Sequence, residues 1–432
     1  MRIGFVVYGD LETRTGGFRY DRRLIAGLRE RGDRVDVISL PWRRYPRGLF
    51  DGLSARLADR LDGPFDVLLE DELAHPSLVG LNRRLRARSD VPIVSVVHHL
   101  RCSEARSSPA RWCSRAVEQR YLDALDGAIC NSESTRTTVE RLAGPALQTT
   151  VAPPAGDRFD PAIDAREIER RAREPGPLRT VFVGSIVQRK GLDSLIAGLS
   201  RLPGDSWTLR VVGSPDADPG YARGVRRQVA RLGLGSRVFF AGELADAALA
   251  DALRASHVLA VPSTHEGFGI AYLEGMGFGL PALASAAGGA REIVDHGETG
   301  YLLRPNAPAE IARALRTLAT DRGHLARMGG GARERFERQP GWAESTARVR
   351  RFLERVVDDA TTGNATPGGA DAVDGRNGSG PSGTDTDGRG GTDPGETSDT
   401  DPGESRADPG VDDGAGVDGK GQERGGGRRV GL

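Results

Sequence analysis

Short apolar runs alternate along most of the chain with longer amphipathic stretches, which is the pattern of a parallel β-sheet covered by helices. Helical periodicity is clear in segments such as Arg19–Arg31 and Trp112–Ala124. The expected strands of the first half are Ile3–Tyr8, Val35–Leu40, Asp66–Leu69, Ile93–His98 and Ala128–Asn131. Those of the second half are Thr180–Gly184, Thr208–Val212, Val238–Ala241, Val258–Pro262, Pro281–Ala284 and Tyr301–Leu303.

A polar, proline-containing stretch, Pro153–Pro177, separates these halves. The pattern therefore predicts an α/β protein with two doubly wound, Rossmann-like domains, whose ligands bind in a cleft at the carboxyl ends of the strands. The expected parts are an N-terminal domain (1–155), a linker (156–177), a C-terminal domain (178–340), a final helix (341–357) that packs back on the first domain, and a tail (358–432).

The tail differs from the rest of the chain in composition. It is rich in Gly, Asp, Thr, Ser and Pro, and it repeats TDPGE at Thr392–Glu396 and Thr400–Glu404. Such a segment buries too little apolar surface to offset its ordering entropy, so we expect a disordered, acidic, solubilising tail, with a partner-binding tail as the alternative. From Asp358 onward there are 16 acidic and seven basic residues, which leaves a net charge of about +9 on the body. A basic body suits an anionic ligand such as a nucleotide diphosphate, an anionic lipid or nucleic acid.

Several classes of protein are disfavoured by the sequence. The three cysteines are scattered, so neither a disulfide framework nor a zinc site is indicated. No apolar run approaches the roughly 20 residues of a membrane span, and the N-terminus resembles a first strand rather than a signal peptide. We expect a cytoplasmic protein. The arginine-rich segments, including Arg22–Arg31, lack interleaved aromatics and are interpreted as solvated helix faces, so no nucleic acid partner is expected.

Two further segments suggest a metal site and a membrane contact. Asp216-Ala217-Asp218 resembles a metal-binding triplet, but it lies in a loop between prolines and similar triplets occur in the tail, so we expect no metal. Residues 101–120 combine Trp112 with several arginines. They could form a basic amphipathic surface for peripheral contact with an anionic membrane at its inner face.

The segment Val261–Gly289 contains the main candidate chemistry. A buried strand ends at Pro262, and a helix is expected to begin near Gly269. Glycines there let backbone N–H groups approach a ligand, and a helix N-terminus favours phosphate. Glu266 and Glu274 flank this start, and carboxylates accept strong hydrogen bonds from sugar hydroxyls. On the residues alone, an ordinary helix entry with one glutamate favouring the dipole and one solvated is an equal alternative.

The same segment resembles the donor-binding signature of glycosyltransferase family 4, E-G-F-G-x-x-x-x-E followed by G-x-P and G-G-x-x-E-I-V. The resemblance extends over roughly residues 1–357 and implies the two-lobed GT-B fold. It also implies that Glu274 holds the nucleotide ribose and Glu266 contacts the transferred sugar. The backbone that would meet sugar and phosphate belongs to Gly267, Phe268, Gly269 and Ile270.

A second motif, Val183–Ile196, resembles the family pattern G-R-x-x-x-x-K-G through Gly184 and Lys190. The resemblance implies that Lys190, the single lysine before the tail, neutralises the donor diphosphate. The usual arginine of the pattern is Ser185 here, so Arg189 is the candidate for a second cation.

The first half matches the family more loosely. Gly16 and Gly17 resemble the glycine loop that faces the donor phosphates. His98, rather than His99, matches the family's histidine near the reacting sugar. The polar cluster from Glu70 to His75 has two open interpretations, the acceptor site and a solvated surface.

The resemblance implies a retaining hexosyltransferase that needs no metal or other cofactor. It would move a sugar from a nucleotide-diphosphate donor to a glycan, lipid-linked or small-molecule acceptor of the cell envelope. The expected catalytic residues are His98, Lys190 and Glu266. A nucleotide-sugar epimerase with the same fold is an alternative that would convert the donor without an acceptor. Ser185 motivates a second alternative, a degenerate protein that binds sugar nucleotides without turnover. The motifs specify neither the nucleotide, the sugar, the acceptor nor the oligomeric state.

Overall fold

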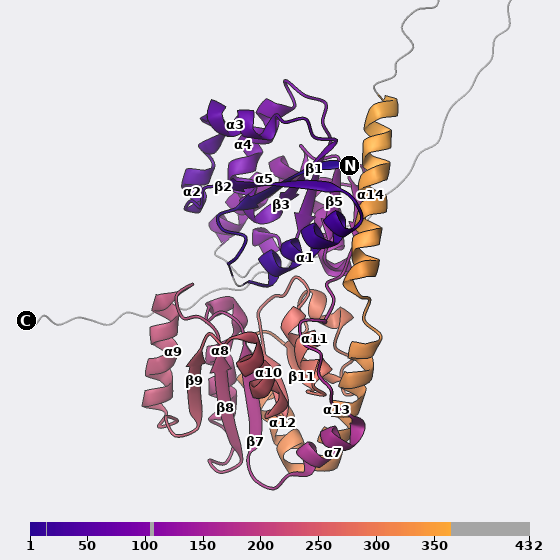
Figure 1. Ribbon diagram of the computed structural model, residues 1–432. Coiled ribbons are helices and arrows are strands. Elements are labelled where there is room, and N and C mark those ends of the chain that lie inside the picture. The colour runs from indigo at the N-terminus through magenta and orange to yellow at the C-terminus, as the bar shows by residue number, and fades with distance from the viewer. Residues whose placement is uncertain (14, 104–107, 364–432) are drawn as a thin grey trace, which may run out of the picture. The chain divides into compact units, whose positions relative to one another are not determined.

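The computed structural model describes residues 1–13, 15–103 and 108–363, which belong to one compact unit. They form two lobes, each built on a six-stranded sheet whose strands are all parallel (Figure 1). The expected α/β architecture with two doubly wound sheets is therefore confirmed. The expected disorder of the tail concerns residues that, from 364 onward, lie outside the described part of the chain.

The first lobe contains a sheet with the strand order β2-β1-β3-β4-β5-β6. Residues of β1 alternate between its two faces. Ile3, Phe5 and Val7 lie on the side of α1 (Gly16–Glu30) and α14 (Trp342–Gly363), and Val6 lies on the side of the helices from α3 (Ala55–Leu61) to α6 (Glu133–Ala143). The strands are β1 (Arg2–Tyr8), β2 (Arg34–Leu40), β3 (Val67–Asp71), β4 (Ile93–Val97), β5 (Gly127–Cys130) and β6 (Gln148–Val151). The helices are α1 (Gly16–Glu30), α2 (Tyr45–Gly48), α3 (Ala55–Leu61), α4 (His75–Leu85), α5 (Ser108–Leu122) and α6 (Glu133–Ala143).

The second lobe repeats the architecture around one hydrophobic core, with the strand order β12-β11-β10-β7-β8-β9. Its strands are β7 (Leu178–Val183), β8 (Trp207–Val212), β9 (Val238–Gly242), β10 (Val258–Val261), β11 (Ala282–Ser285) and β12 (Gly300–Leu303). Its helices are α7 (Ala165–Arg173), α8 (Leu192–Leu199), α9 (Pro219–Arg231), α10 (Asp246–Arg254), α11 (Ile270–Gly277), α12 (Pro308–Thr320) and α13 (Arg322–Glu337).

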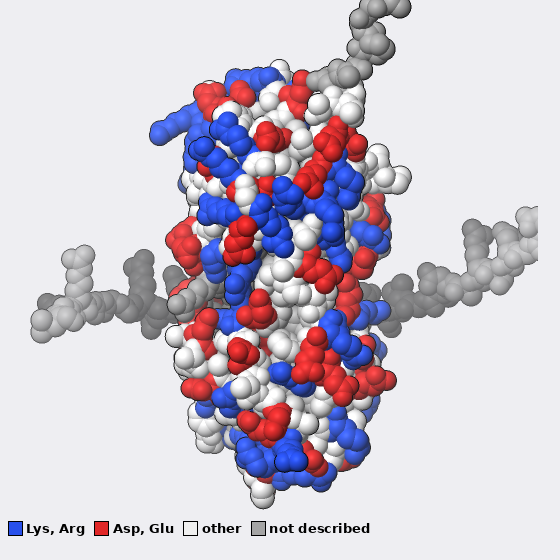
Figure 2. Space-filling model, turned by 45° about the vertical axis from the view of Figure 1, so that its right-hand side comes forward, with Lys and Arg blue, Asp and Glu red and all other residues white. Residues whose placement is uncertain are grey.

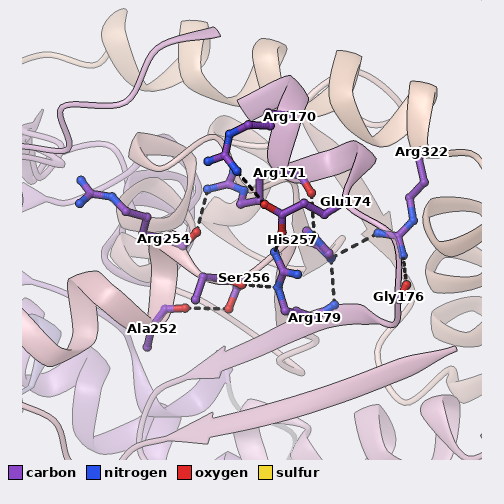
Figure 3. Close-up of polar contacts among 11 residues, drawn as sticks. Arg170, Arg171, Glu174, Gly176, Arg179, Ala252, Arg254, Ser256, His257 and Arg322 are labelled. Carbon is purple, nitrogen blue, oxygen red and sulfur yellow. Dashed lines mark hydrogen bonds and ion pairs between the residues drawn. The ribbon is translucent and has the colours of Figure 1, made fainter. Parts of the chain in front are cut away.

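The segment expected to be a linker contains α7, which is attached to the second lobe through a buried arginine. Arg171 donates to the carbonyl oxygens of Phe278 (2.7 Å) and Arg254 (3.2 Å), at the ends of α11 and α10. Figure 3 shows the contact with Arg254. A cation is favourable there because the carbonyl end of a helix has negative dipole charge. The connection between the lobes that contains no helix therefore runs from the end of β6 at Val151 to Asp164, just before α7.

His257 completes this attachment in the neutral form. Its Nδ1 accepts hydrogen bonds from Arg179 N (3.0 Å) and Arg322 Nη1 (3.3 Å), so its Nε2 donates to Arg171 O (3.0 Å; Figure 3). Burial, together with the neighbouring arginines, lowers the pKa of His257 to about 3. The imidazole therefore acts as a fixed hydrogen-bonding bridge at neutral pH.

The last helix, α14 (Trp342–Gly363), returns to the first lobe and lies along it (Figure 1). Its apolar residues Phe352, Leu353 and Val356 belong to the core formed by β1 and α1. Arg350 Nε lies 2.9 Å from Asp33 Oδ2, so an ion pair connects α14 to the turn between α1 and β2. None of the helices in the described segments has the length and apolar content that crossing a bilayer requires. On the face shown in Figure 2, arginines and carboxylates are interspersed over both lobes.

Candidate functional site

The carboxyl ends of the strands in both lobes border one cleft of about 810 Å³. Parallel strands place their following loops at one edge of the sheet, and ligands bind at that edge. The cleft brings together the residues predicted for catalysis and donor binding: Gly16, Gly17, His98, Gly184, Arg189, Lys190, Glu266, Gly267, Phe268, Gly269, Ile270 and Glu274.

Glu266 is held by two cations from the turn before α8. Its Oε1 lies 2.6 Å from Lys190 Nζ, and its Oε2 lies 3.5 Å from Arg189 Nη1. Ser263 also donates its hydroxyl to this carboxylate. Burial alone raises the pKa of Glu266, but Lys190 and Arg189 outweigh it and lower the pKa to about 2. The site therefore presents a fixed carboxylate beside a lysine ammonium.

Glu274, on α11, is held by a second pair of cations. Arg19 of the first lobe places Nη1 2.6 Å from Glu274 Oε1, and Arg158 places Nη1 3.4 Å from Oε2. Arg158 also lies 2.7 Å from Asp246 Oδ1. Burial raises the pKa of Glu274, and the two arginines oppose that shift. This carboxylate joins the two lobes across the cleft.

The loop before α11 requires glycine at two positions. A Cβ on Gly267 would lie 2.0 Å from the carbonyl oxygen of His98, so only a glycine permits this approach of the lobes. Gly269 has φ of 104°, a left-handed conformation that β-carbons disfavour. Gly269 turns the chain into α11, whose N-terminus then faces the cleft. Unpaired N–H groups at such an end bind anions.

His98, directly after β4, is oriented by carboxylates of its own lobe. Its Nε2 lies 2.9 Å from Asp21 Oδ1, and its backbone N–H donates to Glu72 Oε2 (2.8 Å). Burial alone lowers the pKa of His98, but Asp21, Asp71 and Glu72 outweigh it and raise the pKa to about 9. At neutral pH the cleft therefore contains an imidazolium.

The structure corrects two interpretations from the sequence. Glu70, Asp71, Glu72 and His75 are buried, so they form neither a solvated surface nor part of the cleft lining. Their position at the end of β3, against β4, explains the burial. Of the arginines on α1, Arg23 and Arg29 are exposed, as expected of a solvated face, whereas Arg22 is half-buried, borders the cleft and donates to the carbonyl oxygen of Thr13 (3.3 Å).

Sequence reasoning also missed Arg19, Arg158 and Asp21, which contact the predicted residues. One signal for Arg19 was available, because a cation in the first turn of a helix opposes the helix dipole. The first turn of α1 contains Arg19 and no acidic residue. By contrast, Asp218 of the metal-like triplet has a structural role, since its carboxylate accepts from Tyr221 N (3.0 Å) and caps α9.

Two sequence profiles match the chain along both lobes. The glycosyl transferase 4-like domain matches residues 13–155, and the glycosyl transferases group 1 domain matches residues 164–335. A D-inositol 3-phosphate glycosyltransferase of Xylanimonas cellulosilytica is 31% identical over 306 residues, which cover 67% of this chain and 72% of that protein. The chain belongs to the group 1 glycosyl transferases. The predicted membership in glycosyltransferase family 4 is thereby confirmed.

Other similar proteins extend this comparison. The D-inositol 3-phosphate glycosyltransferase of Streptomyces bingchenggensis is 32% identical over 275 residues, and the match covers 60% of each protein. Among solved structures, sucrose-phosphate synthase from Thermosynechococcus elongatus has a TM-score of 0.71 at 23% identity, covering 83% of this chain and 99% of that chain. Anabaena HepE in complex with UDP-glucose has a TM-score of 0.66 at 21% identity, covering 82% and 100%. These similarities establish the GT-B fold.

Proposed function

We propose that this protein is a retaining hexosyltransferase that uses a nucleoside-diphosphate sugar as donor and needs no metal. One observation carries the proposal: two carboxylates, Glu266 and Glu274, bracket a glycine-lined helix start in the cleft, and each is held by two cations. Such a set offers acceptors for hydroxyl groups and donors for phosphate oxygens within one cleft. HepE, which shares the fold, is described in complex with UDP-glucose.

We assign roles to the main predicted residues as follows. Lys190 and the N-terminus of α11 stabilise the negative charge that develops on the departing diphosphate, which is the dominant catalytic contribution. Glu266 accepts from hydroxyls of the transferred sugar, and Glu274 accepts from the ribose. The departing phosphate takes the proton of the acceptor hydroxyl on the same face of the sugar, so the anomeric configuration is retained. His98 presents its imidazolium to the sugar from the first lobe.

The test is a thermal-shift screen against uridine, guanosine and adenosine diphosphate sugars, followed by turnover with the stabilising donor. We expect a rise in Tm with one nucleotide class, and a product whose anomeric proton coupling matches that of the donor. The assay is repeated with EDTA, because Asp21, Asp71 and His98 place ligand atoms within 4.8 Å of one another. Stabilisation by none of the donors, or conversion of the donor without acceptor, overturns the proposal.

We further propose a glycan, lipid-linked or small-molecule acceptor of the cell envelope, and a cytoplasmic enzyme in peripheral contact with the inner face of the membrane. Trp112 on α5 is 71% exposed and lies between the exposed Arg111 and Arg115. Phe50 and Leu53 are also exposed, and the turn Asp51–Leu53 packs against α4, as α5 does. Aromatic and cationic side chains together favour an anionic interface.

Sedimentation with liposomes tests this contact. The wild-type protein should co-sediment with vesicles that contain anionic lipid and not with neutral ones. Trp112→Ala should reduce co-sedimentation, whereas Phe239→Ala, which removes an exposed aromatic from the second lobe, should not. Equal sedimentation with both kinds of vesicle would overturn the membrane contact.

A further inference from the structure

Glu274, the carboxylate that we assign to the ribose, forms an ion pair with a cation of the opposite lobe. Arg19 Nη1 lies 2.6 Å from Glu274 Oε1, and both side chains are largely buried. A ribose diol bound by this carboxylate needs acceptor sites on its oxygens. Arg19 and Arg158 contact the two oxygens of Glu274, so a ribose diol competes with their guanidinium groups for the lone pairs of this carboxylate.

Arg19 and Arg158 differ in the carboxylate partners that they keep once a ribose has bound to Glu274. Arg158 keeps Asp246, at 2.7 Å, as a second carboxylate partner. For Arg19, the ion pair with Glu274 is the single one found within the described residues. Burial already lowers the pKa of Arg19. A guanidinium displaced from Glu274 inside the cleft therefore needs a new anionic partner.

The position of Arg19 identifies where that partner lies. Arg19 follows Gly16 and Gly17 in the first turn of α1, and a Cβ on Gly16 would lie 3.8 Å from Ile270 Cδ1 at the start of α11. The N-termini of α1 and α11 thus face each other closely across the cleft. Both ends favour an anion, and a guanidinium fork matches phosphate oxygens in geometry.

Among the described residues, the second lobe lacks the arginine that the family pattern has beside Gly184, and its other cations that border the cleft already have partners. Ser185 borders the cleft where the family pattern has an arginine. The guanidinium of Arg189 is engaged, with Nη1 2.9 Å from His265 O and 3.5 Å from Glu266 Oε2. Lys190 is thus the cation of the second lobe that is placed for phosphate, and it is shared with Glu266.

We propose that Arg19 is the second cation for the donor diphosphate, which it contacts from the first lobe after the ribose displaces it from Glu274. This inference rests on the proposed function. It assigns to Arg19, instead of Arg189, the role of the arginine that is Ser185 in this chain. Arg19 and Glu274 belong to different lobes, so the exchange also couples donor binding to the arrangement of the lobes.

Calorimetry on the Arg19→Gln variant tests the proposal, with uridine, guanosine and adenosine diphosphates and the matching nucleosides as probes. For the diphosphate that the wild type binds, we expect an affinity loss of about 10- to 100-fold, the size of a charge-assisted contact. The nucleoside, which has no phosphate, should bind no more weakly than to the wild type. Ser185→Arg in the Arg19→Gln background should restore most of the diphosphate affinity. Arg29→Gln, at the other end of α1, is the matched control and should change neither affinity.

The outcomes separate the inference from the function on which it rests. If the wild type binds none of the diphosphates, the proposed function fails. If it binds one and Arg19→Gln binds it equally well or more tightly, Arg19 merely blocks Glu274 and the inference alone is overturned. Equal losses for the diphosphate and the nucleoside would also overturn it, because the contact would then not be with phosphate.

Discussion

The carboxylate of Asp21 contacts His98 with one oxygen only. Its Oδ1 lies 2.9 Å from His98 Nε2, and its buried Oδ2 has no hydrogen-bond partner among the described residues. A buried carboxylate with one free oxygen is stabilised mainly by the positive charge beside it. The pair therefore keeps the imidazole charged as well as oriented.

This relationship predicts a change in pH dependence for Asp21→Asn. The pKa of His98 is raised to about 9 in the folded protein, from about 6.5 in the unfolded chain. Protonation of His98 therefore contributes fully to the free energy of unfolding below about pH 6.5, and this contribution is lost as the pH rises toward 9. The variant should lower the pKa of His98, because it removes the negative charge in direct contact with the ring and leaves Asp71 and Glu72 as the remaining carboxylates. NMR titration of the ring protons measures it, with His98→Asn to assign the signal and the exposed Asp59→Asn as control. An unchanged titration would contradict this role.

Lys190→Ala and Glu274→Ala should each cripple transfer while leaving the fold intact. Loss of one preorganised charge contact to the transition state reduces kcat by about 10²- to 10³-fold. Lys190→Ala should act mainly on kcat, because the lysine stabilises charge that develops on the leaving group. Glu274→Ala should also raise the KM for the donor, because the ribose contact exists before the reaction. Initial rates over a range of donor concentrations, with circular dichroism spectra of each variant, measure both effects. Near-normal turnover in either variant would contradict the site assignment.

The sequence was sufficient for the strands of both sheets except one. Strand β6 was missed because Gln148–Val151 is a half-exposed edge strand with polar residues, so it has no apolar run. Helix α7 was hidden in a polar stretch, since only Ile168, Arg171 and Ala172 are buried. Local periodicity thus predicts elements with an apolar face and misses those at the margins.

The sequence predicted only those residues of the site that lie together in one short segment of the chain. Glu266, Gly267 and Glu274 lie within one segment, so their proximity follows from the chain itself. The partners Arg19 and Arg158 are 255 and 116 residues away from Glu274, and their contacts depend on how two lobes meet. No local pattern contains that information, and the burial of Glu72 was missed for the same reason.

Gly267→Ala should prevent the close approach of the lobes without unfolding either. The added carbon would lie 2.0 Å from the His98 carbonyl oxygen, which cannot move freely because it accepts from Asn131 Nδ2 (2.9 Å). We expect strong loss of transfer and a larger radius of gyration in small-angle scattering, with a Tm close to that of the wild type. Gly235→Ala, where a Cβ meets nothing within 4 Å, is the control. An active variant with unchanged scattering would show that the lobes work further apart.

Glu292, in the 3₁₀ turn Gly289–Glu292, should hold the two lobes together by capping a helix of the other lobe. Its carboxylate accepts from the backbone N–H groups of Glu133 (2.9 Å) and Ser134 (2.7 Å) at the start of α6. A carboxylate at a helix N-terminus contributes about 0.5–2 kcal/mol, and the amide of Glu292→Gln removes its charge. In this variant, the backbone amides at the N-terminus of α6 should therefore undergo hydrogen–deuterium exchange faster than in the wild type. The variant should also bind the donor more weakly. The exposed Glu298→Gln should do neither. If α6 exchange is unchanged in Glu292→Gln, the capping contact does not hold the lobes in solution.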